Sequence, residues 1–332
     1  MTGHVVMFSG GVGSWGAAKR LVERHGSGDL TLLFTDTLAE DSDLYRFLAE
    51  GAAHLFGTAL PAPLGDAIAA VPDYHGDRFG RRMALAAIRD ALARVLPGLV
   101  WIVEGRDPWQ VFADERFLGN SAIDPCSRVL KRRPAERWLR RHRDPSDTVL
   151  YLGIDWTELH RFAGDRRGGG ARARWAAQGW RLEAPLCEAP PVARPDILGW
   201  LHDVGIAPPD LTRRGFAHNN CSGFCCKAGQ GHYVELLRQF PERYAFHEVQ
   251  EQALRRDLGR DVAMMASRHG GGPKKPLTLA AFRHLVAAGH RVDRFEIGGC
   301  GCFVDGDAVP SWPATAPQNP LSRTLQSKSG VR

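Results

Sequence analysis

A glycine- and serine-rich turn near the N-terminus has the composition of a phosphate-binding loop. Residues 8–14 read Phe-Ser-Gly-Gly-Val-Gly-Ser and follow a short apolar run. Gly10, Gly11 and Gly13 allow the backbone to bend sharply and to approach an anion closely. The hydroxyls of Ser9 and Ser14, with the N–H groups that open the next helix, can hold phosphate oxygens. A tight turn that binds no ligand would use the same glycines, and the loop has neither a Walker A lysine nor GxGxxG spacing.

Cysteines form a second concentration of reactive side chains. The chain has seven cysteines, five of which lie in two glycine-bearing segments, 221–229 and 300–302. Glycines beside thiols let a chain fold around a metal ion or cluster. Adjacent side chains point in different directions, so we expect one ligand from the pair at 225 and 226. The expected ligands are Cys126, Cys221, Cys225 and either Cys300 or Cys302.

The cysteine spacing does not identify the metal. CxxC pairs, which are common at structural zinc sites, are missing, so zinc, an iron–sulfur cluster and free thiols all stay open. His218 precedes the 221–229 segment and His232 follows it. Either histidine could complete a Cys₃His site or move a proton, but an ordinary hydrogen-bonded histidine is the simpler interpretation.

Two basic segments could contact a polyanion. Residues 128–143 carry eight Lys or Arg side chains against one acid, Glu136, and residues 166–174 form an Arg- and Gly-rich run. Self-repulsion on that scale is costly unless an anion offsets it. We expect apolar side chains to anchor one side of a helix over 127–143 while its basic side chains face outward. Nucleic-acid contact, a solvated charged face and small-anion binding remain alternatives.

The elements around these residues predict an α/β fold. Apolar runs at 4–8, 30–34, 99–103 and 148–152 alternate with helical periodicity at 15–25, 41–55, 81–96 and 127–143. This alternation favours a doubly wound, mostly parallel sheet over residues 1–187. After a Pro-rich stretch the pattern changes to helices and loops, which predicts a smaller helical, cysteine-bearing domain over 196–305. Residues 310–332 show no periodicity and are expected to be disordered.

Overall composition narrows the class of protein. With 332 residues, 44% hydrophobic and 24% charged, the chain can build one or two ordinary cores. No run approaches the length of a membrane span, and the N-terminus lacks a signal-peptide pattern, so we expect a cytoplasmic protein without a membrane partner. The net charge of +6 permits an anionic substrate or a nucleic acid.

The SGGVGS loop resembles the SGGxxS pyrophosphate loop of the adenine nucleotide alpha hydrolase (PP-loop) superfamily, and specifically its phosphoadenosine phosphosulfate (PAPS) reductase-like branch. Three later segments are similar to that branch in order and spacing. They are 35–37 with Asp36, 126–134 with Cys126 and Lys131, and 153–161 with Glu158 and Arg161. The resemblance covers about residues 4–165 and extends to DNA phosphorothioation sulfur-transfer proteins.

The resemblance implies a site for ATP. Ser9, Gly10, Gly11, Gly13 and Ser14 would hold the phosphates. Asp36 would lie near the adenosine, and the residues Lys131, Glu158 and Arg161 would act at the substrate side. A [4Fe–4S] cluster would be favoured over zinc, because both related groups include cluster-bearing members. The family's loop often reads SGGxDS, and Gly13 replaces that aspartate. Mg²⁺ would then be held elsewhere, with Asp36 and Asp41 as candidates.

Three functions follow as hypotheses. The first is an ATP pyrophosphatase-type enzyme that cleaves ATP between the α- and β-phosphates, adenylates a substrate, and transfers sulfur to an anionic acceptor such as nucleic acid, with a possible sulfur-donor protein. The second is a reductase of PAPS or adenosine phosphosulfate, in which Cys300 or Cys302 would have to supply the attacking thiolate. The third is a nucleotide- and nucleic-acid-binding component without turnover, which the Gly13 replacement favours.

Overall fold

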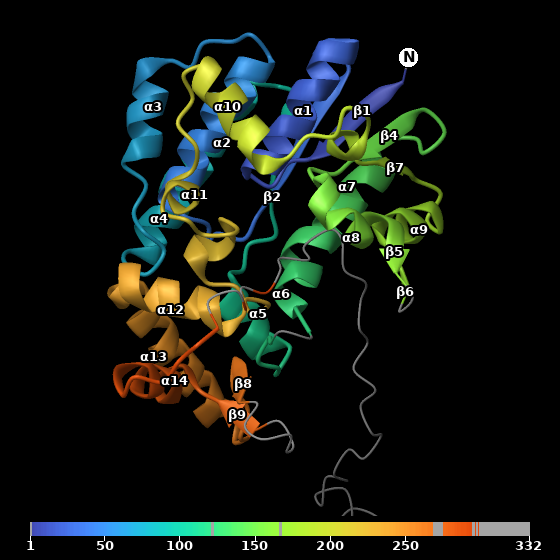
Figure 1. Ribbon diagram of the computed structural model, residues 1–332. Coiled ribbons are helices and arrows are strands. Elements are labelled where there is room, and N and C mark those ends of the chain that lie inside the picture. Colours follow the sequence, from blue (N-terminus) through green and yellow to red (C-terminus); the bar gives the residue numbers. More distant parts are fainter. Residues whose placement is uncertain are drawn as a thin grey trace, which may run out of the picture.

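A five-stranded parallel sheet forms the centre of the N-terminal half of the chain (Figure 1). The computed structural model describes residues 2–120, 123–165, 168–267, 275–293, 296 and 298. The strand order is β3-β2-β1-β4-β7, and every neighbouring pair is parallel. The strands are β1 (Gly3–Met7), β2 (Leu30–Asp36), β3 (Leu99–Val103), β4 (Thr148–Tyr151) and β7 (Arg181–Glu183). The predicted α/β class with a parallel sheet is therefore confirmed.

The helices and two small hairpins complete the described elements. The helices are α1 (Val12–His25), α2 (Ser42–Leu55), α3 (Ala62–Ala69), α4 (Arg78–Val95), α5 (Pro108–Asp114), α6 (Pro125–Ser127), α7 (Arg133–His142), α8 (Leu159–Ala163), α9 (Ala171–Ala176), α10 (Arg194–Asp203), α11 (Asp210–Arg213), α12 (Gln230–Gln239), α13 (Pro241–Leu258) and α14 (Leu279–Ala287). The hairpins pair β5 (Gly164–Asp165) with β6 (Gly168–Gly169) and β8 (Met265–Ser267) with β9 (Lys275–Leu277).

Helices cover both faces of the sheet because both faces are apolar. Successive side chains of a strand point to opposite faces. Val6 and Phe8 join a core with α1, α2, α3, α4 and α10, whereas Val5 and Met7 pack with α7, α8 and α9 on the other side. This arrangement is consistent with a doubly wound sheet.

The helices after residue 210 pack around a separate apolar cluster. Tyr233, Tyr244 and Phe282 are buried in that cluster together with Trp109 of α5, and Figure 1 shows α12, α13 and α14 gathered away from the sheet. Helix α10 instead lies over α1 and contributes Ile197 to the sheet core. The sheet core therefore includes α10, and the expected domain ranges 1–187 and 196–305 stay a prediction.

The basic helix expected over 127–143 is interrupted by a π-helical turn. Residues Arg128–Arg132 form this turn, and the N–H of Arg133 donates to the carbonyl oxygen of Arg128 five residues earlier. The wider turn shifts the helix face, so Lys131 and Arg132 point inward and are buried. The prediction that the basic side chains of 127–143 face outward is therefore correct only for part of this segment. Its exposed arginines are Arg133, Arg137, Arg140 and Arg141.

Several predictions fall outside the described residues. These are the disordered tail at 310–332, the cysteines Cys300 and Cys302, and the first two arginines of the 166–174 run. Among the helices that the structure describes, none combines the length and apolar character needed to cross a bilayer.

Candidate nucleotide site

A cavity of about 530 Å³ opens where β1 and β4 end. From β1 the chain builds outward to β2 and β3 on one side, and to β4 and β7 on the other. The gap between β1 and β4 is thus the topological switch point, where open α/β sheets bind ligands. The loop after β1 and residues 152–161 after β4 both line this cavity. Two of the segments singled out from the sequence therefore meet at one site.

The loop between β1 and α1 has the geometry of an anion cradle. Gly10 has a φ of +73°, a conformation that favours glycine. Gly11 caps α1, so the first N–H groups of this helix open at the loop. The hydroxyl of Ser14 donates to the carbonyl oxygen of Gly11 at 2.9 Å, and the hydroxyl of Ser9 donates to that of Ser14 at 3.4 Å. Both hydroxyls line the cavity and can turn to an anion there.

Close backbone packing explains the glycine at position 13. A Cβ at Gly13 would lie 2.5 Å from the carbonyl oxygen of Gly153, and a Cβ at Gly153 would lie 2.3 Å from the backbone nitrogen of Ser14. The two loops that line the cavity therefore touch through their glycines. An aspartate at position 13 has no room unless one of these backbones moves.

Glu158 and Arg161, which the resemblance places at the substrate side, line the cavity and form an ion pair with each other. Asp155, which also lines the cavity, accepts a hydrogen bond from the N–H of Thr157 at 2.8 Å and so fixes the first turn after β4. Asp155 and Glu158 are the carboxylates that line this cavity within the described residues.

Asp36 lies elsewhere, buried at the C-terminal end of β2. Its carboxylate accepts hydrogen bonds from the N–H of Leu38 at 2.7 Å, the hydroxyl of Tyr45 at 2.9 Å and the indole N–H of Trp101 at 3.2 Å. Asp36 does not line the cavity. Burial, together with the nearby carboxylate of Glu40, raises the pKa of Asp36 to about 6. The structure thus gives Asp36 contacts that organise the end of β2.

The raised pKa predicts a pH-dependent effect of Asp36→Asn. The carboxyl of Asp36 has a pKa of about 6 in the folded state, above its ordinary value of 3.8. The folded state therefore holds the proton more tightly. The stability that this provides is fully present below pH 3.8 and is lost as the pH rises through 6. Asparagine does not titrate. Between pH 5 and pH 7 the free energy of unfolding of the variant should therefore rise by about 1 kcal/mol relative to wild type. Urea unfolding at both pH values measures this change, with the exposed Asp66→Asn as control; an unchanged difference would contradict it.

Lys131 is buried rather than solvated. Its ammonium lies 3.0 Å from Glu40 Oε1 and donates to Asn220 Oδ1 at 3.0 Å, and the Lys131 and Glu40 side chains are 4% and 0% exposed. Glu40 Oε2 accepts the N–H of Cys221 at 2.6 Å. Lys131 does not line the 530 Å³ cavity, but its partner Asn220 does. Lys131 therefore stabilises the cavity wall through its hydrogen bond to Asn220 without lining the cavity itself.

The thiols gather around a second, much smaller cavity. Cys126, Cys221, Cys225 and Cys226 line a space of about 20 Å³, and Asn220 lines both this space and the larger cavity. The Sγ atoms of Cys126 and Cys226 are 3.7 Å apart. The sequence predicts one ligand from the adjacent pair, whereas both Cys225 and Cys226 line this space. Residues 225–228 form a turn in which the N–H of Ala228 donates to the carbonyl oxygen of Cys225 at 2.9 Å.

The space between the described thiols is about 20 Å³, which is smaller than a [4Fe–4S] cubane. Two of the expected ligands, Cys300 and Cys302, lie outside the described residues, so the cluster stays a prediction. Tetrahedral zinc, with Zn–S bonds of about 2.3 Å, places its sulfurs about 3.8 Å apart, close to the spacing of Cys126 and Cys226. Within the described part of the chain, however, no group of three or more His, Cys, Asp or Glu side chains is arranged to hold a metal ion.

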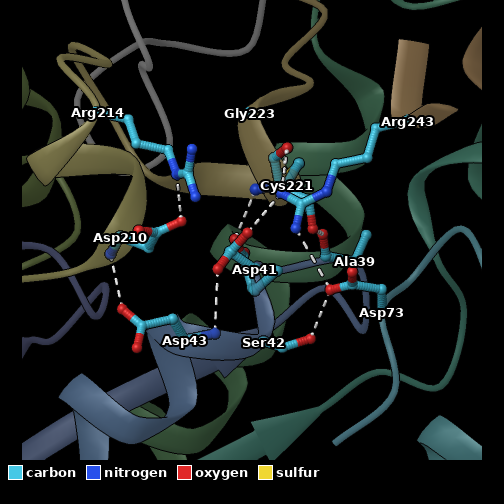
Figure 2. A network of polar contacts seen from close by, with 12 residues as sticks. Ala39, Asp41, Ser42, Asp43, Asp73, Asp210, Arg214, Cys221, Gly223 and Arg243 are labelled. Carbon is cyan, nitrogen blue, oxygen red and sulfur yellow. Dashed lines mark hydrogen bonds and ion pairs between the residues drawn. The ribbon is translucent and has the colours of Figure 1, made fainter. Parts of the chain in front are cut away.

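A polar network joins the end of β2 to the cysteine loop (Figure 2). Arg243 of α13 donates to Asp41 at 2.5 Å and to Asp73 at 3.3 Å. The hydroxyl of Ser222 donates to the carbonyl oxygen of Ala39 at 2.9 Å. These contacts hold the loop after β2 against the cysteine loop. The carboxylate of Asp41, proposed as a Mg²⁺ ligand, is paired with Arg243 and does not line the larger cavity.

The far wall of the larger cavity contains residues that sequence reasoning missed or undervalued. Arg194, Asn219 and Asn220 line it together with His218. The simpler interpretation of the histidines holds for His232, whose Nε2 lies 2.7 Å from the carbonyl oxygen of Gly223. It does not hold for His218, because neither of its buried ring nitrogens has a hydrogen-bond partner within the part of the chain that the structure describes. The polar run His-Asn-Asn at 218–220 was the available signal for His218, whereas Arg194 lies in the Pro-rich stretch after which the sequence pattern changes.

Fold and site together define an open α/β protein with a glycine-rich loop at the switch point of its sheet. No protein-family model matches this chain, and no curated protein is significantly similar to it.

Proposed function

We propose that the chain binds ATP in the 530 Å³ cavity and cleaves it between the α- and β-phosphates to adenylate an anionic acceptor. One observation carries this proposal: the glycine-rich loop after β1 and the 153–161 segment after β4 converge on one cavity at the switch point. These are two of the segments on which the resemblance to PP-loop enzymes was based. A large cavity lined by polar loops and backbone N–H groups suits a nucleotide.

The chemistry assigned to the site is nucleotidyl transfer. An acceptor oxygen forms a bond to the α-phosphorus, the bond from that phosphorus to the bridging oxygen breaks, and pyrophosphate leaves. The Ser9 and Ser14 hydroxyls and the N–H groups at the start of α1 would hold the leaving phosphates. Arg161, positioned by its ion pair with Glu158, would offset the charge that develops on them.

Mg²⁺, when bound with the nucleotide, supplies further charge neutralisation. Asp155 and Glu158 are the carboxylates of the described residues that would meet it, because they line the cavity. Asp36 and Asp41 are not suited to this role in the described arrangement, since neither lines the cavity and both carboxylates have buried partners.

The thiols are proposed to serve sulfur transfer, with a sulfur-donor protein as a further partner. Proximity supports this role of the thiols, because Asn220 lines both the thiol space and the nucleotide cavity. Burial raises the pKa of Cys221, and hydrogen bonds with Cys126 and Cys225 raise the pKa of Cys226, so neither thiol is poised as a thiolate. Of the two metals that the sequence suggests, zinc fits the described thiol spacing better. Metal analysis decides between one zinc and about four irons per chain.

Product analysis tests the proposed reaction. The full chain is incubated with Mg²⁺ and ATP labelled at the α-phosphate, with and without nucleic acid, and in a parallel reaction with PAPS and reduced thioredoxin. The proposal predicts AMP or an adenylated acceptor together with pyrophosphate. Sulfite from PAPS would instead establish the reductase. Nucleotide binding without any product would establish the component without turnover.

Nucleic acid is the proposed acceptor class, and the exposed arginines of α7 are its proposed contact. Replacing all four by glutamine should reduce the slope of log K against log salt by about 3 to 4, because each phosphate contact contributes about 0.9. The variant changes Arg133, Arg137, Arg140 and Arg141, and the control changes the exposed Arg213, Arg214, Arg238 and Arg256. Fluorescence anisotropy with a labelled duplex measures the slope. An equal loss of slope in both variants would mean that the arginines of α7 contribute only nonspecific charge and are not the contact with nucleic acid.

A further inference from the structure

The imidazole of His218 lacks the hydrogen-bond partners that such a group normally has. Both ring nitrogens are buried and neither has a partner among the described residues, although the half-buried residue lines the 530 Å³ cavity. Its ring stacks on His232 at 4.5 Å between centroids, which fixes its orientation. An unpaired buried polar group costs free energy, so a histidine held in this way calls for a ligand that supplies the missing hydrogen bonds.

Arg194 holds the segment that carries His218. Its guanidinium donates to the carbonyl oxygens of Ala217 at 2.9 Å and of Phe216 at 3.1 Å. Arg194 is the first residue of α10 and lines the same cavity. Asp155 and Glu158 act on it electrostatically, but no ion pair in the described part of the chain includes it. Its charge is thus partly buried and unmatched by a contacting carboxylate.

After burial, the groups that act most strongly on the pKa of His218 are cationic or basic. Lys131, Arg161 and Arg194 all act on the ring, as does His232, and with burial they lower the pKa of His218 well below its ordinary value. The imidazole is therefore neutral and offers one N–H donor and one acceptor nitrogen. Such surroundings disfavour a cationic ligand and favour an oxyanion.

The neighbouring amides complete a donor-rich wall. The side-chain oxygen of Asn219 accepts from the hydroxyl of Thr212 at 2.9 Å, and that of Asn220 accepts from Lys131 at 3.0 Å. Both residues line the cavity. Each side-chain oxygen already accepts a hydrogen bond inside the protein. The group that remains for a ligand is the NH₂ of each amide, which donates hydrogen bonds.

We propose that Arg194 and His218 form a subsite for the oxyanion of the second substrate, distinct from the phosphate loop and facing it across the same cavity. Arg194 supplies the charge, His218 donates one hydrogen bond and accepts another from a ligand O–H or N–H, and the amides of Asn219 and Asn220 add donors. The subsite gives the acceptor of the proposed adenylation a defined place, and in that respect it rests on the proposed function.

Calorimetry on the full chain tests the subsite. Inorganic phosphate, dimethyl phosphate and acetate are titrated separately into protein saturated with α,β-methylene ATP, so that a monoester-like, a diester-like and a carboxylate oxyanion are distinguished. At least one anion should bind. Its affinity should fall about tenfold or more in His218→Phe, which retains a ring to stack on His232, and in Arg194→Gln. Both variants should keep their affinity for the nucleotide analogue, and Arg213→Gln, exposed on α11, should match wild type.

An independent signature separates binding from a structural role. With ¹⁵N-labelled histidine, the ring nitrogens of His218, assigned by their loss in His218→Phe, should shift when the anion is added and should not shift with chloride at equal ionic strength. The subsite is refuted if the analogue binds and no anion does, or if the anion binds equally well to both variants. If the analogue itself does not bind, the proposed function fails, and phosphate titrated into the free protein still decides the subsite.

Discussion

Replacing Gly13 by aspartate is expected to weaken ATP binding by about 100-fold, although aspartate is the residue that PP-loop enzymes often have at this position. The expected cause is steric. A Cβ at position 13 would lie 2.5 Å from the carbonyl oxygen of Gly153, and a backbone atom cannot swing away as a side chain can. The loop after β1 or the loop after β4 must move, and both line the cavity. Gly13→Ala, which adds the Cβ without charge, should lose most of the same affinity.

Gly28 provides the matched control for these variants. A Cβ at Gly28 meets no atom within 4 Å, so Gly28→Asp should bind ATP like wild type. Calorimetry with ATP and Mg²⁺ measures all three variants. If Gly13→Asp bound ATP as tightly as wild type, the close approach to Gly153 would be unimportant, and tighter binding would indicate that the aspartate had restored a metal ligand.

Replacing Lys131 by methionine is expected to lower the free energy of unfolding by about 3–5 kcal/mol. The substitution leaves the carboxylate of Glu40 buried without its cation, since Glu40 is 0% exposed and lies 3.0 Å from the ammonium. Removing both charges in Lys131→Met/Glu40→Gln should recover a large part of the loss, because burying a neutral amide is much less costly than burying an unpaired charge.

Urea unfolding of the single and double variants gives the coupling energy between the two side chains. The exposed pair of Arg238 and Glu235 provides the control, and Arg238→Met should change stability by no more than about 0.5 kcal/mol. A double variant no more stable than Lys131→Met would mean that the pair itself contributes little and that the lysine acts through its contact with Asn220.

Strand patterns in the sequence predicted four of the five strands of the sheet. The predicted run 30–34 lies in β2, whose seven residues are all buried, as is typical of a strand covered on both faces. The predicted strand 99–103 matches the structure residue for residue. Short elements such as β7, with three residues, carry too little periodicity to be recognised.

The candidate site could be predicted only in part. The glycine-rich loop after β1 was found because glycine and serine at a strand end are visible in sequence, and the 153–161 segment was found through the family resemblance. The buried position of Lys131 was not visible, because it depends on a π-helical turn that shifts the helix face. His218 and Arg194 reach the cavity through packing between distant segments, which no local pattern encodes.

Isothermal calorimetry of the full chain with ATP, comparing wild type with Ser9→Ala/Ser14→Ala, tests the central claim most directly. If the turn after β1 holds the phosphates of an adenine nucleotide, the wild-type chain gives a saturable heat of binding and the double variant binds at least about tenfold more weakly. Absence of any binding heat in the wild-type chain, or equal affinity in the double variant, would contradict the claim.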